Sequence, residues 1–183
     1  MPLRVILFLS RNRDNKEIQG FKERAKIFLT DKEDISELRP AFDKFVLDGV
    51  AGEMSRFYVS INSRNPEIIK KILVKKILYD NISILDMNTI TCSVADLAEC
   101  ASEKRWLFDY DEDSYGAVQS FIEKVKEYGN FTEKEVELHD TPNGYAVVVK
   151  HGFDTRKLLA EFPCATLKRD DKLCYDWNFK VVL

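Results

Sequence analysis

A hydrophobic stretch that ends in two closely spaced aspartates constrains the fold of this chain more than any other feature. The stretch Trp106-Leu107-Phe108-Asp109-Tyr110-Asp111 precedes an amphipathic pattern that covers residues 115–129. Side chains alternate along a β-strand with period two, so a strand here places Asp109 and Asp111 on one face. The sequence therefore predicts a central strand that presents two carboxylates and is followed directly by a helix.

Two converging carboxylates are a typical site for a hard cation such as Mg²⁺ or Mn²⁺. A structural interpretation of Asp109 and Asp111 stands beside the metal interpretation. Acidic residues also end strands simply because the chain reaches the surface there, and paired carboxylates occur in purely structural roles.

Hydrophobic periodicity assigns most of the remaining chain to short strands and helices. Residues 25–29 fit either a strand or the end of a helix. Besides the Trp106–Asp111 stretch, strands are expected at 3–9, 56–62, 82–87, 135–139, 145–150, 165–168 and 173–177, and helices at 34–47, 66–79, 93–102, 115–129 and 154–160.

The helix expected at 66–79 has clear start signals. Asn65 can cap its first turn, and Pro66 suits the first helical position. Apolar residues from Ile68 to Leu78 predict a wide buried face, with four lysines on the solvated side.

Turn signals predict two hairpins in the C-terminal half. Asn143-Gly144 lies between the strands expected at 135–139 and 145–150, and both residues tolerate positive φ. Asp170-Asp171 separates the last two expected strands, which we expect to pair with each other.

This pattern predicts an α+β fold with a mainly antiparallel sheet and helices packed on it. A chain of 183 residues fits either one continuous domain or a strand-helix appendage at 1–50 joined to a core at 51–183. A doubly wound nucleotide fold fits less well, because none of the 7 glycines lies in a glycine-rich turn after the first strand.

Composition predicts an intracellular, cytoplasmic protein with no membrane partner. The chain is 45% hydrophobic and 32% charged, and no apolar run approaches the roughly 20 residues needed to span a bilayer. The four cysteines form no CxxC pair, which disfavours zinc. A net charge of −3 argues against nucleic-acid binding through bulk positive charge.

The order of short motifs between Lys104 and Trp177 resembles that of archaeo-eukaryotic primases and primase-polymerases. The Asp109-x-Asp111 stretch resembles their first motif, Thr141-Pro142-Asn143-Gly144 their second, and Tyr175-Asp176 their third. The resemblance implies an RRM-like or ferredoxin-like sheet and carboxylates that bind divalent metal. It also implies a histidine that contacts the incoming nucleotide.

This chain departs from that pattern at the expected histidine, where it has Ala146. His151 lies five residues further on, and an odd shift along a strand points to the opposite face. The departure implies a changed activity or none. The haloacid-dehalogenase-type phosphatases also place Asp-x-Asp after a strand, but they usually begin the chain with it.

Two functions from different classes follow. The first is a protein that binds metal and a nucleotide or nucleic acid, with turnover left open and no catalytic residue assigned. Its predicted metal ligands are Asp109, Asp111 and Asp176, and its predicted phosphate-binding residues are Arg64, Asn143, Gly144 and Lys150.

The second function is a non-catalytic protein that inhibits a host nuclease or nucleoprotein, as anti-CRISPR proteins do. The acidic balance and Ala146 favour it, as does a resemblance to small bacteriophage proteins. The apolar segment 177–183 is either a final strand of the sheet or a homodimer contact.

Overall fold

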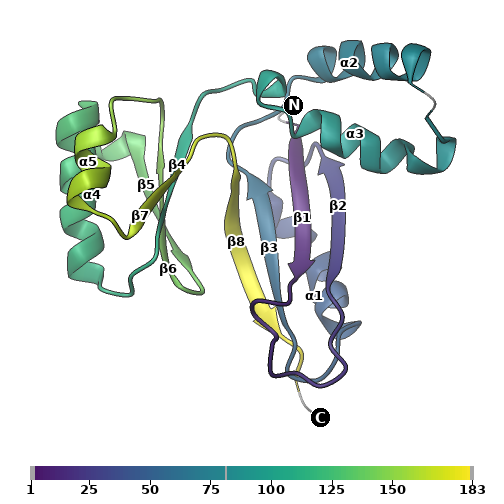
Figure 1. Ribbon diagram of the computed structural model, residues 1–183, viewed down its shortest axis with the longest axis horizontal. Coiled ribbons are helices and arrows are strands. Elements are labelled where there is room, and N and C mark those ends of the chain that lie inside the picture. The colour runs from purple at the N-terminus through teal and green to yellow at the C-terminus, as the bar shows by residue number, and fades with distance from the viewer. Residues whose placement is uncertain (1–2, 81, 182–183) are drawn as a thin grey trace.

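Two antiparallel sheets form the framework of the protein (Figure 1). The computed structural model describes residues 3–80 and 82–181. Within these residues the first sheet has the strand order β2-β1-β3-β8, the second has β5-β6-β4-β7, and five α-helices accompany them. The predicted α+β class is confirmed, with the strands divided between two sheets.

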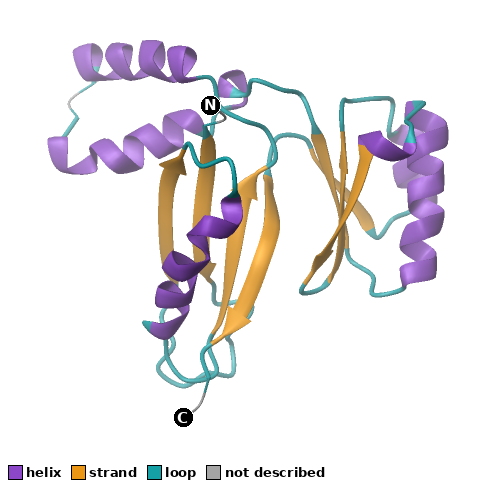
Figure 2. Ribbon diagram, turned by 180° about the vertical axis from the view of Figure 1, so that it is seen from behind, coloured by secondary structure: helices purple, strands orange, loops and turns teal. Residues whose placement is uncertain are grey.

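The first sheet combines the N-terminal strands with the last strand of the chain. The helix α1 covers one of its faces, as Figure 2 shows from behind. The core between them contains the fully buried side chains Phe8, Phe42 and Phe57. The strands are β1 (Arg4–Ser10), β2 (Arg24–Thr30), β3 (Met54–Ser60) and β8 (Lys172–Phe179), and α1 spans Arg39–Leu47 after a 3₁₀ turn at Ile35–Leu38.

The second sheet contains the predicted Asp-x-Asp strand at a central position. Phe108 and Tyr110 of this strand are buried against Phe121 of the following helix, which leaves Asp109 on the opposite face. The strands are β4 (Trp106–Tyr110), β5 (Val136–Thr141), β6 (Gly144–Val149) and β7 (Ala165–Lys168), and the helices are α4 (Tyr115–Gly129) and α5 (Arg156–Glu161).

The predicted hairpin of the last two strands is wrong. β7 pairs with β4 in the second sheet, whereas β8 pairs with β3 in the first. The turn between them is held by Asp170, which accepts hydrogen bonds from Asn62 and Arg64. These long-range contacts direct the two strands into different sheets.

The region after α2 (Pro66–Tyr79) also differs from the prediction. The strand expected at 82–87 is instead a 3₁₀ turn at Ile84–Asp86, and α3 (Met87–Ala95) begins before the helix expected at 93. The wide buried face expected on α2 is wrong too, because Ile69 is its only buried residue among those described. The second half of α2 extends away from the sheet (Figure 1).

The suggested boundary near residue 50 stays a prediction, although strands from both sides of it pair within the first sheet. β8 includes the strand expected at 173–177 and covers residues 177–179 of the apolar segment 177–183, whose residues 182–183 lie outside the described part of the chain. Among the described helices, none combines the length and apolar character needed to cross a membrane.

Candidate functional site

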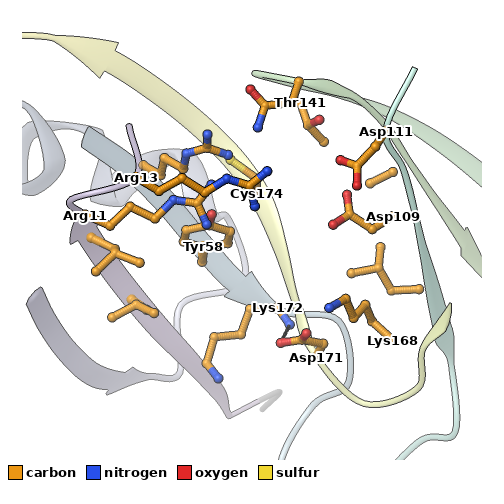
Figure 3. Close-up of a pocket in the computed structure, with 16 residues that line it drawn as sticks. Arg11, Arg13, Tyr58, Asp109, Asp111, Thr141, Lys168, Asp171, Lys172 and Cys174 are labelled. Atoms are coloured by element: carbon orange, nitrogen blue, oxygen red, sulfur yellow. Dashed lines mark hydrogen bonds between the residues drawn. The ribbon is translucent and has the colours of Figure 1, made fainter. Parts of the chain in front are cut away.

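A cleft of about 310 Å³ lies between the two sheets (Figure 3). We call it the inter-sheet cleft. One wall comes from β1, β3, β8 and the loop after β1, and the other from β4, β6, β7 and the β5–β6 turn. Side chains that are far apart in the sequence therefore face one another across it.

Asp109 and Asp111 form the acidic wall. Both point from the β4 side into the cleft (Figure 3). Neither carboxylate has an ion-pair partner among the residues that the structure describes, and Asp109 is only half-buried. Burial raises the pKa of the Asp109 carboxyl above its usual range, and the charge of Asp111 adds to this effect while Lys168 opposes it. The structure thus brings together two of the three predicted metal ligands, Asp109 in β4 and Asp111 directly after it.

We expect Asp109→Asn to stabilise the protein at neutral pH. A raised pKa means that the folded protein binds this proton more tightly than the unfolded chain, so ionisation of Asp109 lowers stability. The free energy of unfolding should rise by at most about 1 kcal/mol, because solvent in the open cleft screens the charge of Asp109. This gain should shrink as the pH falls through the raised pKa of Asp109 and should disappear below about 4, where an ordinary aspartate is also protonated. Urea unfolding at pH 7 and at acidic pH measures the difference, and an equal gain at both would contradict this origin.

Arginines from the first sheet form the basic wall. Asp14 accepts hydrogen bonds from Arg56 Nε at 2.6 Å and from Arg11 Nε at 2.8 Å. Although burial opposes ionisation of Asp14, these two guanidinium groups lower the pKa of its carboxyl. Asp14 thereby fixes both arginines beside the cleft. Arg13 also lines the cleft and has no ion-pair partner within the described residues.

Both walls of the cleft also carry apolar side chains. Leu7, Leu9 and the ring of Tyr58 line it from the first sheet, and Leu107 and the small side chain of Ala146 from the second. Cys174 lies there as well, but burial raises the pKa of its thiol to about 12. That thiol is protonated at neutral pH and is therefore a poor nucleophile.

The β5–β6 turn borders the opening of the cleft. Thr141 and Asn143 line the cleft, and Asn143 also lies near Arg13 at its outer edge. The predicted hairpin is confirmed, but Gly144, with φ of +141°, is the residue with positive φ. A Cβ atom on Gly144 would lie 2.3 Å from the carbonyl oxygen of Tyr110. Glycine is therefore required for the turn to approach the carboxylate end of β4.

Three other predicted site residues lie away from the carboxylates. Asp176 forms an ion pair with Arg39 of α1, and Lys150 pairs with Glu135 at 3.0 Å. Arg64 is fully buried and donates to Asp170 at 2.7 Å. None of the three lines the inter-sheet cleft.

Sequence reasoning missed the cations that face Asp109 and Asp111. Arg11 and Arg13 lie outside every predicted strand and helix, and only the structure shows that the loop after β1 lies opposite β4. It also missed His139, which lies opposite Ala146 across the β5–β6 ladder, while Ala146 lies opposite Asp109; His139 itself lines a second pocket and not the cleft. Alternating side chains in the two predicted strands would have been sufficient to place His139 on this face.

Three acidic side chains line the cleft, and two of them, Asp109 and Asp111, lie next to each other on the β4 side and are available for a cation, whereas Asp171 lies in the β7–β8 turn. In the described part of the chain, no group of three or more His, Cys, Asp or Glu side chains is close enough to hold a metal. Mg²⁺ commonly binds through one or two carboxylates plus waters and substrate phosphates, so Asp109 and Asp111 fit that mode. Comparison of the chain with known proteins found no matching family model, curated protein or solved structure.

Proposed function

We propose that the inter-sheet cleft binds a nucleotide or nucleic-acid phosphate together with Mg²⁺ or Mn²⁺. The observation that carries this proposal is the pair of unpaired carboxylates, Asp109 and Asp111, opposite the guanidinium groups of Arg11 and Arg13. Carboxylates hold a hard cation, the cation binds phosphate oxygens, and guanidinium groups donate to the remaining phosphate oxygens.

The remaining surface of the cleft suits the rest of a nucleotide. The apolar surface that Tyr58 and Leu9 form on the wall of the first sheet could take a base or sugar, because aromatic side chains stack on bases of any sequence. In this proposal Asp109 and Asp111 take the role of the metal-binding carboxylates of a reduced primase-polymerase core, whereas Asp176, the third predicted ligand, lies outside the cleft. We propose binding and not catalysis, because Ala146 lies at the position where the resemblance to primase-polymerases places a histidine.

Calorimetry with ATP in the presence and absence of Mn²⁺ tests this proposal. We expect ATP to bind with Mn²⁺ and to bind far more weakly without it. Arg13→Gln should weaken binding roughly tenfold, because it removes charge-assisted hydrogen bonds to phosphate. Lys150→Gln is the matched control, since Lys150 is exposed and pairs with Glu135 outside the cleft. Equal binding with and without Mn²⁺, or equal losses in both variants, would contradict the proposal.

We propose protein binding without catalysis as a second candidate function, favoured by the tip of the α2–α3 hairpin. Leu78, Tyr79, Ile84 and Leu85 are exposed by 70%, 83%, 87% and 94%. Contiguous exposed apolar patches commonly mark interaction surfaces. The proposed partner is a host nuclease or nucleoprotein, in line with the expectation of a bacteriophage or mobile-element inhibitor.

Replacement of the two leucines among these four residues tests the second candidate. Leu78→Ser combined with Leu85→Ser should abolish capture of the partner from a host extract and leave nucleotide binding in the cleft intact. Leu47→Ser is the control, because Leu47 is 63% exposed at the end of α1. Capture that survives the double change, or that Leu47→Ser removes equally, would exclude this surface.

A further inference from the structure

A second pocket, of about 220 Å³, lies on the opposite side of β8 from the inter-sheet cleft. We call it the Arg4 pocket. β8 contributes Lys172 and Cys174 to the cleft, but Leu173 and Tyr175 to the Arg4 pocket. Alternate residues of a strand point to opposite faces, so the two cavities open on different faces of the first sheet.

The charged groups of the Arg4 pocket leave one cation without a partner. Arg105 Nη2 lies 2.6 Å from a carboxylate oxygen of Glu137, and His139 Nε2 lies 3.4 Å from the same oxygen. Glu137 is thus already shared by two neighbours. Arg4 has no ion pair with any described residue, and its buried Nε has no hydrogen-bond partner.

A guanidinium group that no carboxylate neutralises at the wall of a pocket indicates what kind of ligand would fit. Arg4 is only partly buried and lines the pocket, so an anionic ligand there can accept charge-assisted hydrogen bonds from its guanidinium group. The two guanidinium groups and one carboxylate leave an excess positive charge, even with His139 neutral. The pocket therefore favours an anion.

The rest of the pocket is apolar and large enough for a small ring. Val59, Val148 and Leu173 line it beside the ring of Tyr175. A closed apolar cavity of about 150 Å³ is sufficient to bind benzene. Apolar walls with a few convergent polar groups are typical of small-molecule sites.

We infer that the Arg4 pocket binds a small organic anion, a carboxylate or a phosphate monoester. The anionic group of this ligand contacts Arg4, and the apolar part of the ligand packs against Val59, Val148 and Leu173. This site is separate from the one proposed for nucleotide and metal. A buried apolar cluster that includes Ile61 and Leu107 lies between the two cavities.

Titration of the ¹⁵N-labelled protein with three probes, followed by NMR, tests this inference. Phenyl phosphate and benzoate carry the two alternative anionic groups, and benzyl alcohol is the uncharged control. We expect the anions to shift the amide signals of residues 59–61, 137–139 and 173–175. Benzyl alcohol should bind at least roughly tenfold more weakly, because it lacks the charge-assisted hydrogen bond. The tighter of the two anions identifies the ligand class.

Variants locate the binding site. Arg4→Gln should weaken both anions roughly tenfold, whereas Arg13→Gln, which removes an unpaired cation from the other cavity, should leave them unchanged. Glu137→Gln removes the competing carboxylate and should tighten binding, which gives a test even if Arg4→Gln fails to fold. The inference would be overturned if the anions shifted only the amide signals of residues in the inter-sheet cleft. It would also be overturned if the Arg4→Gln variant bound the anions as tightly as the wild type, or if the Glu137→Gln variant bound them no more tightly.

Discussion

Asp109→Asn combined with Asp111→Asn should eliminate measurable Mn²⁺ binding while the protein stays folded. The two carboxylates are the predicted direct ligands, and both line the inter-sheet cleft. Loss of an outer-shell partner already costs roughly 10–100-fold in metal affinity at known sites, so loss of two direct ligands should cost at least as much. Calorimetric titration with Mn²⁺ measures the change.

The control for this experiment is Asp113→Asn, an equal change in charge at an exposed residue that does not line the cleft. It should leave Mn²⁺ affinity unchanged. The double variant should also be no less stable than the wild type, because it removes two like charges from one wall of the cleft. Unchanged Mn²⁺ binding by the double variant would show that the carboxylates are structural.

Local patterns predicted the acidic wall of the site. The alternation of Phe108, Asp109 and Tyr110 is sufficient to decide which side chains enter the core of the second sheet and which face outward. Asn143-Gly144 likewise marks the turn that reaches this wall. The strand alternation and the turn signal each lie within a few residues of the structure that they predict. Such local structure can therefore be predicted from one sequence without knowledge of the tertiary contacts.

The basic wall of the site could not be predicted in this way. Arg11 and Arg13 face the cleft because β8 does not pair with β7 in the second sheet. It pairs instead with β3 in the first sheet. That choice depends on Asn62 and Arg64, which hold the β7–β8 turn through Asp170 from more than 100 residues away. In the absence of these contacts, a short turn between two strands predicts a simple hairpin.

For helix α2, the local structure was predicted correctly but the burial of its side chains was not. Its N-terminal cap was predicted correctly, since Asn65 accepts hydrogen bonds from the amides of Glu67 and Ile68. Its apolar residues were expected to be buried, yet Leu78 is 70% exposed because the helix extends beyond the first sheet. Amphipathic spacing identifies a helix, but it does not identify what covers the apolar face.

Arg64→Met should destabilise the protein by about 3–5 kcal/mol, the usual cost of removing one partner of a buried ion pair. The Arg64 side chain is 0% exposed and lies between Asp170, at 2.7 Å, and Asp96, at 3.8 Å. Methionine retains much of the side-chain volume but leaves Asp170 without its cation. The free energy of unfolding in urea, compared with that of the wild type, measures the loss.

Two further variants separate a structural role of Arg64 from the phosphate-binding role that the sequence suggested. Arg64→Met combined with Asp170→Asn should recover part of the lost stability, because the uncompensated carboxylate is removed. Lys150→Met should cost less than about 1 kcal/mol, since the Lys150 side chain is 66% exposed in its pair with Glu135. If Arg64→Met instead weakens nucleotide binding and leaves stability unchanged, the phosphate-binding prediction is correct and the ion pair is incidental. The fully buried position of Arg64 favours the structural role, because a ligand phosphate cannot reach a side chain with no exposed surface.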